Sequence, residues 1–188
     1  MWALVESGSV SKIYSRPTQI KINDINYPSN IFMLWSSSEL KAIGIYEIVI
    51  DNTNLKDKKY YINTNQSFNF ASDTVTASYG TATAKAIADV TDDDGNVTKG
   101  LKSIKKENLN AEAGGILQST DWMVIREADG GTAMPSNIKT WRASVRTKAN
   151  DMCTQIDNAA DVDALAALYV YNNATPPVRP LGEFPELS

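Results

Sequence analysis

One stretch of the sequence, residues 136–156, restricts the fold more than any other. Apolar side chains recur there at steps of three or four residues: Ile138, Trp141, Val145, Ala149, Met152 and Ile156. This spacing places all of them on one face of an α-helix. Residues 105–118 form a second apolar stripe, made of Leu109, Ala113, Ile116 and Leu117. Because the connection between the two segments is short, we expect them to pack as an antiparallel helical hairpin.

The segments around this hairpin add two shorter helices. Asp121 is expected to cap a short helical turn that carries Trp122 and Ile125, and Gly130 and Gly131 end that turn. A third helix is predicted from about residue 161 to residue 171, with Asp161 as its cap.

The pair Gly114–Gly115 lies inside the first helix of the hairpin and has two interpretations. The pair is either a simple weak point, costing roughly 1–2 kcal/mol of helix propensity, or a place where two helices approach closely. The sequence favours neither.

The first hundred residues predict β-structure with one short helix. Alternating or β-branched runs indicate strands at residues 2–5, 11–14, 18–23, 45–51, 59–63 and 66–70. Ser36 and Glu39 have the spacing of a capping box, and Gly44 is placed to end the short helix that follows. The acidic run 92–96 can be compared with a calcium loop, but the ligand spacing fails on both sides of Gly95. A hairpin turn with Gly95 in a left-handed conformation is the preferred interpretation.

These patterns define the fold class as α+β and divide the chain into three parts. The composition changes near residue 100, so a β-rich docking domain is predicted for residues 1–100 and a helical hairpin domain for residues 101–171. Residues 172–188 form an extended, proline-rich tail. Its apolar residues would be exposed if the tail were free, so we expect it to lie on its own domain rather than on another subunit.

Composition excludes several functions. The chain of 188 residues has no histidine, which excludes serine–histidine and cysteine–histidine catalysis, and its net charge of −4 argues against a nucleic-acid partner. Cys153 is the single cysteine and is interpreted as a packing residue. No apolar run is long enough for a membrane span, and the first residues lack the basic start and apolar core of a signal peptide. We therefore expect no enzyme activity, and we predict no catalytic, cofactor-binding or metal-binding residue.

Two motifs resemble a known family. The run Ile116-Leu117-Gln118-Ser119-Thr120-Asp121-Trp122, followed by Trp141-Arg142-Ala143-Ser144-Val145-Arg146, is similar to a helical hairpin of tailed-bacteriophage tail proteins. That family includes tail-fibre assembly proteins and other virion components. Residues 26–45, with Ile43-Gly44-Ile45 at their end, resemble the amino-terminal module of such proteins.

The resemblance implies a structural protein of a phage tail or baseplate, which binds other tail or fibre proteins; a second copy of the chain is a further candidate partner. Its location would be the virion tail, and the host cytoplasm during assembly. A tail-fibre assembly chaperone is the first alternative. A receptor- or glycan-binding module is the second, and it would use the aromatic residues Tyr14, Tyr27, Tyr46, Tyr60, Tyr61 and Tyr79.

The candidate interaction residues are Trp122, Trp141, Arg142, Arg146, Arg179 and Phe184. The two tryptophans are expected to be buried between the helices of the hairpin. Arg142 and Arg146 lie one helical turn apart, and either belong to a solvated face or pair with acidic residues across the hairpin or on a neighbouring subunit. The candidate acidic partners within the hairpin are Asp121, Glu127 and Asp129.

Overall fold

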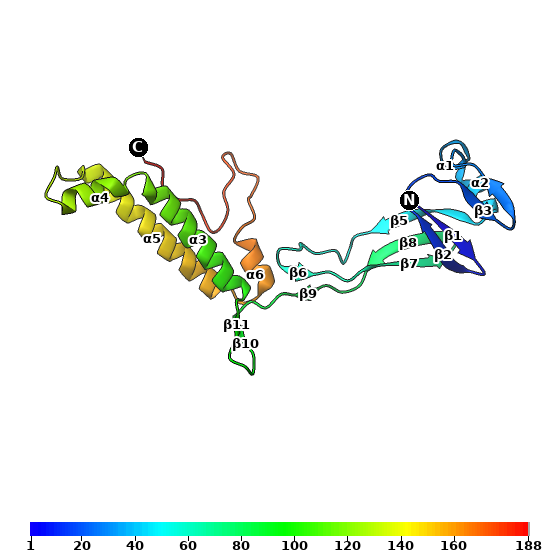
Figure 1. Cartoon of the computed structure of the whole chain (residues 1–188), viewed down its shortest axis with the longest axis horizontal. Helices are drawn as coiled ribbons and strands as arrows, with labels where there is room; N and C mark the ends of the chain where they lie inside the picture. The colour runs from blue at the N-terminus through cyan, green and yellow to red at the C-terminus, as the bar shows by residue number, and fades with distance from the viewer. Residues whose placement is uncertain (188) are drawn as a thin grey trace. The chain divides into compact units, whose positions relative to one another are not determined.

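The structure is a computed structural model that describes residues 1–187. Strands predominate before residue 100 and helices after it, which confirms the α+β class (Figure 1). The chain divides into two compact units: the amino-terminal unit, Met1–Thr83, and the carboxy-terminal unit, which begins at Ala84.

The division between the units lies earlier in the chain than the predicted boundary near residue 100. Residues 84–100 belong with the helices because backbone hydrogen bonds tie them to the first long helix. The amides of Leu101 and Lys102 donate to the carbonyls of Ala86 and Ile87 at 2.9 and 3.0 Å. The change in composition at residue 100 therefore marks the start of a helix, and the unit itself begins before it.

A five-stranded sheet forms the amino-terminal unit. Its strand order is β2-β1-β5-β8-β7, with β1 at Trp2–Glu6, β2 at Ser9–Tyr14, β5 at Ile45–Asp51, β7 at Gln66–Ala71 and β8 at Thr74–Tyr79. Neighbouring strands are antiparallel except β5 and β8, which run parallel. Strands β2 and β7 lie at opposite ends of this order and nevertheless contact each other. The sheet is therefore curled, which brings its two terminal strands together.

Three hairpins of this unit use the same kind of turn. β3 (Ile20–Ile22) and β4 (Ile25–Tyr27) form one of them, and the others join β1 to β2 and β7 to β8. Each has a two-residue loop in which both residues have positive φ: Ser7–Gly8, Asn23–Asp24 and Ser72–Asp73. Such loops match the natural twist of paired strands and fix their register.

Two short helices follow the hairpin of β3 and β4, where the sequence predicted one. They are α1 (Ile31–Leu34) and α2 (Ser37–Ala42). The predicted capping box is confirmed, because the amide of Glu39 donates to Ser36 Oγ and the amide of Ser36 donates to Glu39 Oε2. Gly44 has a φ of +82° and ends the helical segment as expected.

The curled sheet has an apolar cluster on each face. Alternation along β1 sends Leu4 to one face and Ala3 to the other. The first cluster packs β1, β2, β3, β5 and the two helices together through Leu4, Tyr14, Ile20, Ile22, Ile31, Phe32, Leu40 and Ile45. The second, inside the curl, contains Ala3, Ile48, Val75 and Ala77.

Four helices form most of the carboxy-terminal unit: α3 (Leu101–Gln118), α4 (Asp121–Ala128), α5 (Ser136–Asn158) and α6 (Val162–Ala167). Helices α3 and α5 pack against each other, which confirms the hairpin. The predicted face of α5 is buried except for Trp141, which is half-buried. The first helix begins four residues earlier than predicted, and the third ends at Ala167 rather than at residue 171. Among residues 1–187, no helix combines the length and the apolar character needed to cross a membrane.

The close-approach interpretation of Gly114–Gly115 is wrong. A Cβ atom added to either glycine would meet no atom within 4 Å, and both residues are exposed. The pair lies on the outer side of α3 and is a simple weak point in the helix.

Two small two-stranded sheets complete the secondary structure. β6 (Tyr61–Ile62) pairs with β9 (Thr83–Ala84), and β10 (Val90–Thr91) pairs with β11 (Val97–Thr98). Gly95 lies in the β10–β11 turn with a φ of +83°, so the predicted hairpin turn is confirmed.

The tail packs on its own unit, as expected. Leu181 is fully buried, and its amide donates to the carbonyl of Leu168 at 3.1 Å. Phe184 packs against a cluster formed by Ala113, Val145 and Ala149. The carbonyl of Pro185 accepts a hydrogen bond from the indole Nε1 of Trp141 at 2.9 Å.

Candidate protein-interaction surface

A buried arginine joins three helices at one end of the carboxy-terminal unit. Arg142 projects from α5 and is only 5% exposed. Its Nη1 donates to the carbonyl of Leu117 at 2.8 Å and to the hydroxyl of Thr120, and its Nη2 donates to Asp121 Oδ1 at 2.7 Å. One planar guanidinium thus binds the last turn of α3, the connecting residue and the first residue of α4.

This arrangement decides one open alternative and corrects one sequence prediction. Arg142 pairs with Asp121 across the hairpin and does not belong to a solvated face, because it is buried and its guanidinium donates to Leu117, Thr120 and Asp121. Asp121 does not cap α4, because it is the first helical residue and Thr120 occupies the N-cap position without a side-chain capping bond. The carboxylate of Asp121 instead orients the helix through Arg142.

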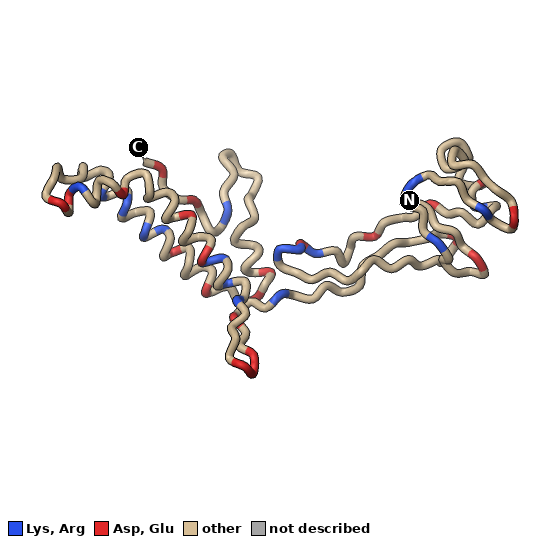
Figure 2. The backbone as a smooth tube through the Cα atoms, in the orientation of Figure 1, with Lys and Arg blue, Asp and Glu red and all other residues tan. Residues whose placement is uncertain are grey.

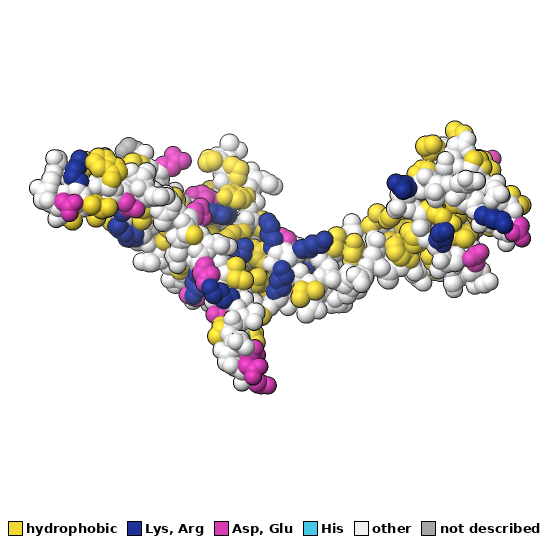
Figure 3. Space-filling view, viewed as in Figure 1, with side chains coloured by type: hydrophobic (Ala, Val, Ile, Leu, Met, Phe, Trp, Pro, Cys, Tyr) yellow, Lys and Arg dark blue, Asp and Glu magenta, His cyan; other side chains and the backbone are white. Residues whose placement is uncertain are grey.

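Helix α4 is held in place but carries no buried residue. Trp122, Val124 and Ile125 are 52%, 42% and 63% exposed. Trp122 and Ile125 are three residues apart and share one side of the helix, which we call the Trp122 face. Hydrophobic side chains are visible on this end of the unit in Figure 3.

The prediction that Trp122 is buried against the facing helix is therefore wrong. Its indole lies 4.8 Å from the guanidinium carbon of Arg126, which is itself fixed because Arg126 Nε donates to the carbonyl of Thr132 at 3.0 Å. Such a pair orders an aromatic ring without covering it. The ring is thus presented to solvent in a defined position.

The other side of α4 forms one wall of a shallow pocket of about 250 Å³. The pocket is lined by Val124, Glu127, Met134, Lys139, Arg142 and Arg146. We call it the α4–α5 pocket. Arg142 is neutralised by Asp121, and Lys139 Nζ lies 2.6 Å from Glu127 Oε1. Arg146 is exposed and makes no salt bridge within residues 1–187. The pocket therefore has a surplus of positive charge.

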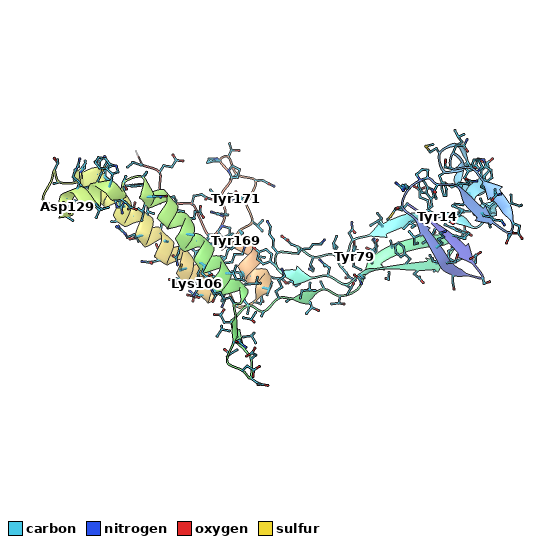
Figure 4. The ribbon with its side chains drawn as sticks, viewed as in Figure 1. Tyr14, Tyr79, Lys106, Asp129, Tyr169 and Tyr171 are labelled. Atoms are coloured by element: carbon cyan, nitrogen blue, oxygen red, sulfur yellow. The ribbon has the colours of Figure 1, made fainter. Side chains whose placement is uncertain are left out.

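Two donors hold the carboxylate of Glu127 in this pocket. Lys139 donates to one oxygen, and the amide of Met134 donates to the other at 3.3 Å. These bonds, that of Lys139 first, lower the pKa of Glu127 below its ordinary value. The two hydrogen bonds to Glu127 together fix the segment that connects α4 to α5. Asp129, a further predicted partner of the arginines, lies in the turn after α4 (Figure 4) and pairs with neither of them.

The remaining candidate residues lie along the packed tail. Trp141 and Phe184 belong to the same cluster, so they hold the tail in place and are not exposed contacts. Arg179 donates to Glu183 Oε2 at 2.8 Å and to the carbonyl of Gly182 at 3.1 Å. Tyr169 and Tyr171, which Figure 4 shows in the segment after α6, lie against its guanidinium. Arg179 therefore closes the tail on itself.

The aromatic residues named for a glycan site do not form an exposed platform. Tyr14 and Tyr60 are buried, and the other four are half-buried. Cys153 is half-buried, and burial raises the pKa of its thiol, which suits the predicted packing role.

Sequence reasoning missed several members of this surface. Thr120 gave no signal, because its role depends on Arg142 reaching it from a different helix. Val124, Met134 and Lys139 are separated in sequence and come together only through the turn after α4. In the amino-terminal unit, and not part of this surface, Met33 and Leu34 on α1 are 71% and 73% exposed, and sequence reasoning missed these two residues as well.

Comparison with protein-family models, curated proteins and solved structures found no match to this chain.

Proposed function

We propose that this protein is a structural component of a bacteriophage tail or baseplate, and that it docks another tail protein on the Trp122 face of α4. The phage assignment is supported by the resemblance of the Thr120-Asp121-Trp122 and Trp141-Arg142 motifs to tail-protein hairpins. The docking role is supported by the exposure of Trp122 on a fixed helix.

The energetics favour a partner at this position. Tryptophan residues account for an unusual share of the binding energy in protein interfaces. A half-exposed tryptophan beside an exposed isoleucine gives a partner a large apolar contact. Because Arg142 already fixes the start of α4, docking costs little conformational entropy.

Quantitative mass spectrometry of purified phage particles tests the assignment. A structural component is present at a fixed copy number relative to the major tail protein, whatever the expression level. Chemical cross-linking within the particles should then join lysines near α4, such as Lys139, to a tail protein.

The alternative functions give different results in the same work. If the chain is abundant during infection but missing from purified particles, the protein is instead the assembly chaperone and acts in the host cytoplasm. Binding of the isolated chain to a glycan array, without association with tail proteins, would replace both proposals by a receptor-binding module.

A further inference from the structure

The β10–β11 hairpin is the least supported element of the carboxy-terminal unit. Residues 88–99 are all exposed, including Val90 at 53% and Val97 at 60%. Its strands are two residues long, and a hairpin of this size gains little stability on its own in water. It nevertheless presents one exposed valine on each side of a defined turn.

Hydrogen bonds order the tip of this hairpin and leave acidic groups pointing outward. Asp92 Oδ1 accepts from the amides of Asp94 and Asn96 at 3.1 and 2.8 Å. Asp93 and Asp94 make no salt bridge within residues 1–187 and are exposed. The tip is thus a fixed acidic knob with apolar flanks, and its acidic residues stand out in Figure 2.

The α4–α5 pocket has the complementary character. It has a surplus of positive charge, its unpaired cation is Arg146, and Val124 provides an apolar wall. Knob and pocket therefore match in charge and in the apolar groups beside the charge. Such complementarity fixes the choice of partner and the orientation of the contact.

A single chain cannot join its own knob to its own pocket. The hairpin immediately precedes α3, while the pocket is formed by residues that follow it. Helix α3 has 18 residues, so its length of about 27 Å separates the two features. Figure 1 shows them at opposite ends of the α3–α5 hairpin.

We propose that the β10–β11 knob of one molecule docks in the α4–α5 pocket of a second copy of this chain. Asp93 and Asp94 pair with Arg146 of the second copy, and a valine of the hairpin packs beside Val124. Because the two surfaces differ, the contact is head-to-tail and repeats along a series of molecules as a ring or a filament. This contact leaves the Trp122 face free for the tail protein.

Sedimentation velocity of the full chain over a concentration series tests the proposal. The wild-type protein should form species larger than a dimer as concentration rises, and added salt should weaken the association. Two variants remove one surface each without creating a new charge: Asp93→Asn with Asp94→Asn, and Arg146→Gln. Each alone should weaken self-association at least tenfold.

Mixing the two variants is the decisive experiment. One variant keeps its pocket and the other keeps its knob, so an equimolar mixture should form a one-to-one dimer and nothing larger. Asp151→Asn and Arg16→Gln, at exposed positions that belong to neither surface, are controls for the loss of one charge of each sign and should associate like the wild type. Circular dichroism of each variant confirms folding.

Two results would overturn the proposal. One is a wild-type chain that stays monomeric at every concentration. The other is a mixture of the two variants that sediments as monomers, as each variant does alone. Both are independent of whether the chain occurs in phage particles.

Discussion

Arg142 Nη2 lies 2.7 Å from Asp121 Oδ1, and this contact connects the second turn of α5 to the first turn of α4. The arginine side chain is 6% exposed while that of the aspartate is 51% exposed, so the two partners of one salt bridge differ in environment. Most of the stabilisation of the α4 start therefore comes from the buried hydrogen bonds of Arg142 to Leu117 and Thr120. The salt bridge to Asp121 mainly orients α4.

Replacement of Arg142 should therefore cost much more than replacement of Asp121. Arg142→Met leaves the carbonyl of Leu117 and the hydroxyl of Thr120 without their donor, and we expect a loss of about 2–4 kcal/mol in the free energy of unfolding. Asp121→Asn should cost under about 1 kcal/mol, because its side chain is half-exposed. Urea unfolding followed by circular dichroism measures both. Equal losses of unfolding free energy for the two variants would contradict the larger contribution assigned to Arg142.

The packed tail should stabilise its unit through Leu181. Leu181→Ala removes a fully buried side chain and should lower the free energy of unfolding by about 2–4 kcal/mol. Leu187→Ala is the matched control, because Leu187 is 45% exposed and its loss should cost under about 0.5 kcal/mol. Thermal unfolding of both variants compares them, and equal melting temperatures would show that the tail is not part of the core.

Two glycines of the carboxy-terminal unit should respond in opposite directions to alanine. A Cβ atom on Gly114 meets nothing within 4 Å, so Gly114→Ala should stabilise α3 by about 0.5–1 kcal/mol. A Cβ atom on Gly100 would lie 2.2 Å from the carbonyl oxygen of Ala88, so Gly100→Ala should cost about 1–3 kcal/mol. Urea unfolding of the two single variants gives the sign of each effect. Stabilisation by Gly100→Ala would show that residues 84–100 are not packed on the helix.

The helical hairpin was predictable because its signal is long and regular. The apolar face of α5 repeats regularly from Ile138 to Ile156, and tertiary contacts cannot easily override so many consistent positions. The packing of the tail on its own unit was also predicted correctly, because apolar side chains in a proline-rich segment are stable only when they are buried against other residues. By contrast, the Ser72–Asp73 turn was missed because it has two positive φ angles and no glycine.

The interaction surface was only partly predictable, because it depends on contacts between elements. The position of Arg142 beside an apolar stripe fits equally well with exposure or burial, and only Thr120 and Leu117 on another helix decide between them. Trp122 was predicted to be core because of its size, but α4 is too short and too lightly packed to bury it. The pocket joins residues from two helices and a turn, a juxtaposition that no sequence period encodes.

Trp122→Ala should separate binding from stability. The indole is half-exposed and its contact with Arg126 is a surface interaction, so we expect a loss under about 1 kcal/mol in the free energy of unfolding. Affinity for the tail protein that cross-links to this chain in particles should fall roughly thirtyfold or more, as for a central interface tryptophan. Isothermal titration measures the affinity. Ile104→Ala, at a 41% exposed position on α3, is the control and should leave affinity unchanged.

Acid should weaken the link between α4 and α5 through Glu127. Hydrogen bonds from Lys139 and from the amide of Met134 lower the pKa of Glu127 in the folded state below its ordinary value of 4.5. Between the two pKa values the unfolded chain binds more protons than the folded one, so stability rises with pH across that window. The stabilisation is complete above pH 4.5, falls as the pH drops further, and is lost once the pH passes below the folded-state pKa.

The variant Glu127→Gln isolates this contribution, because it cannot ionise. Its melting temperature should depend less steeply on pH than that of the wild type between about pH 5 and about pH 3, and the two curves should converge at the acid end. Glu112→Gln, which removes an exposed carboxylate without a salt bridge among residues 1–187, is the control. Parallel curves for Glu127→Gln and the wild type would mean that Lys139 and Met134 do not hold this carboxylate. The pocket wall would then lack the fixed position on which the docking of a second copy depends.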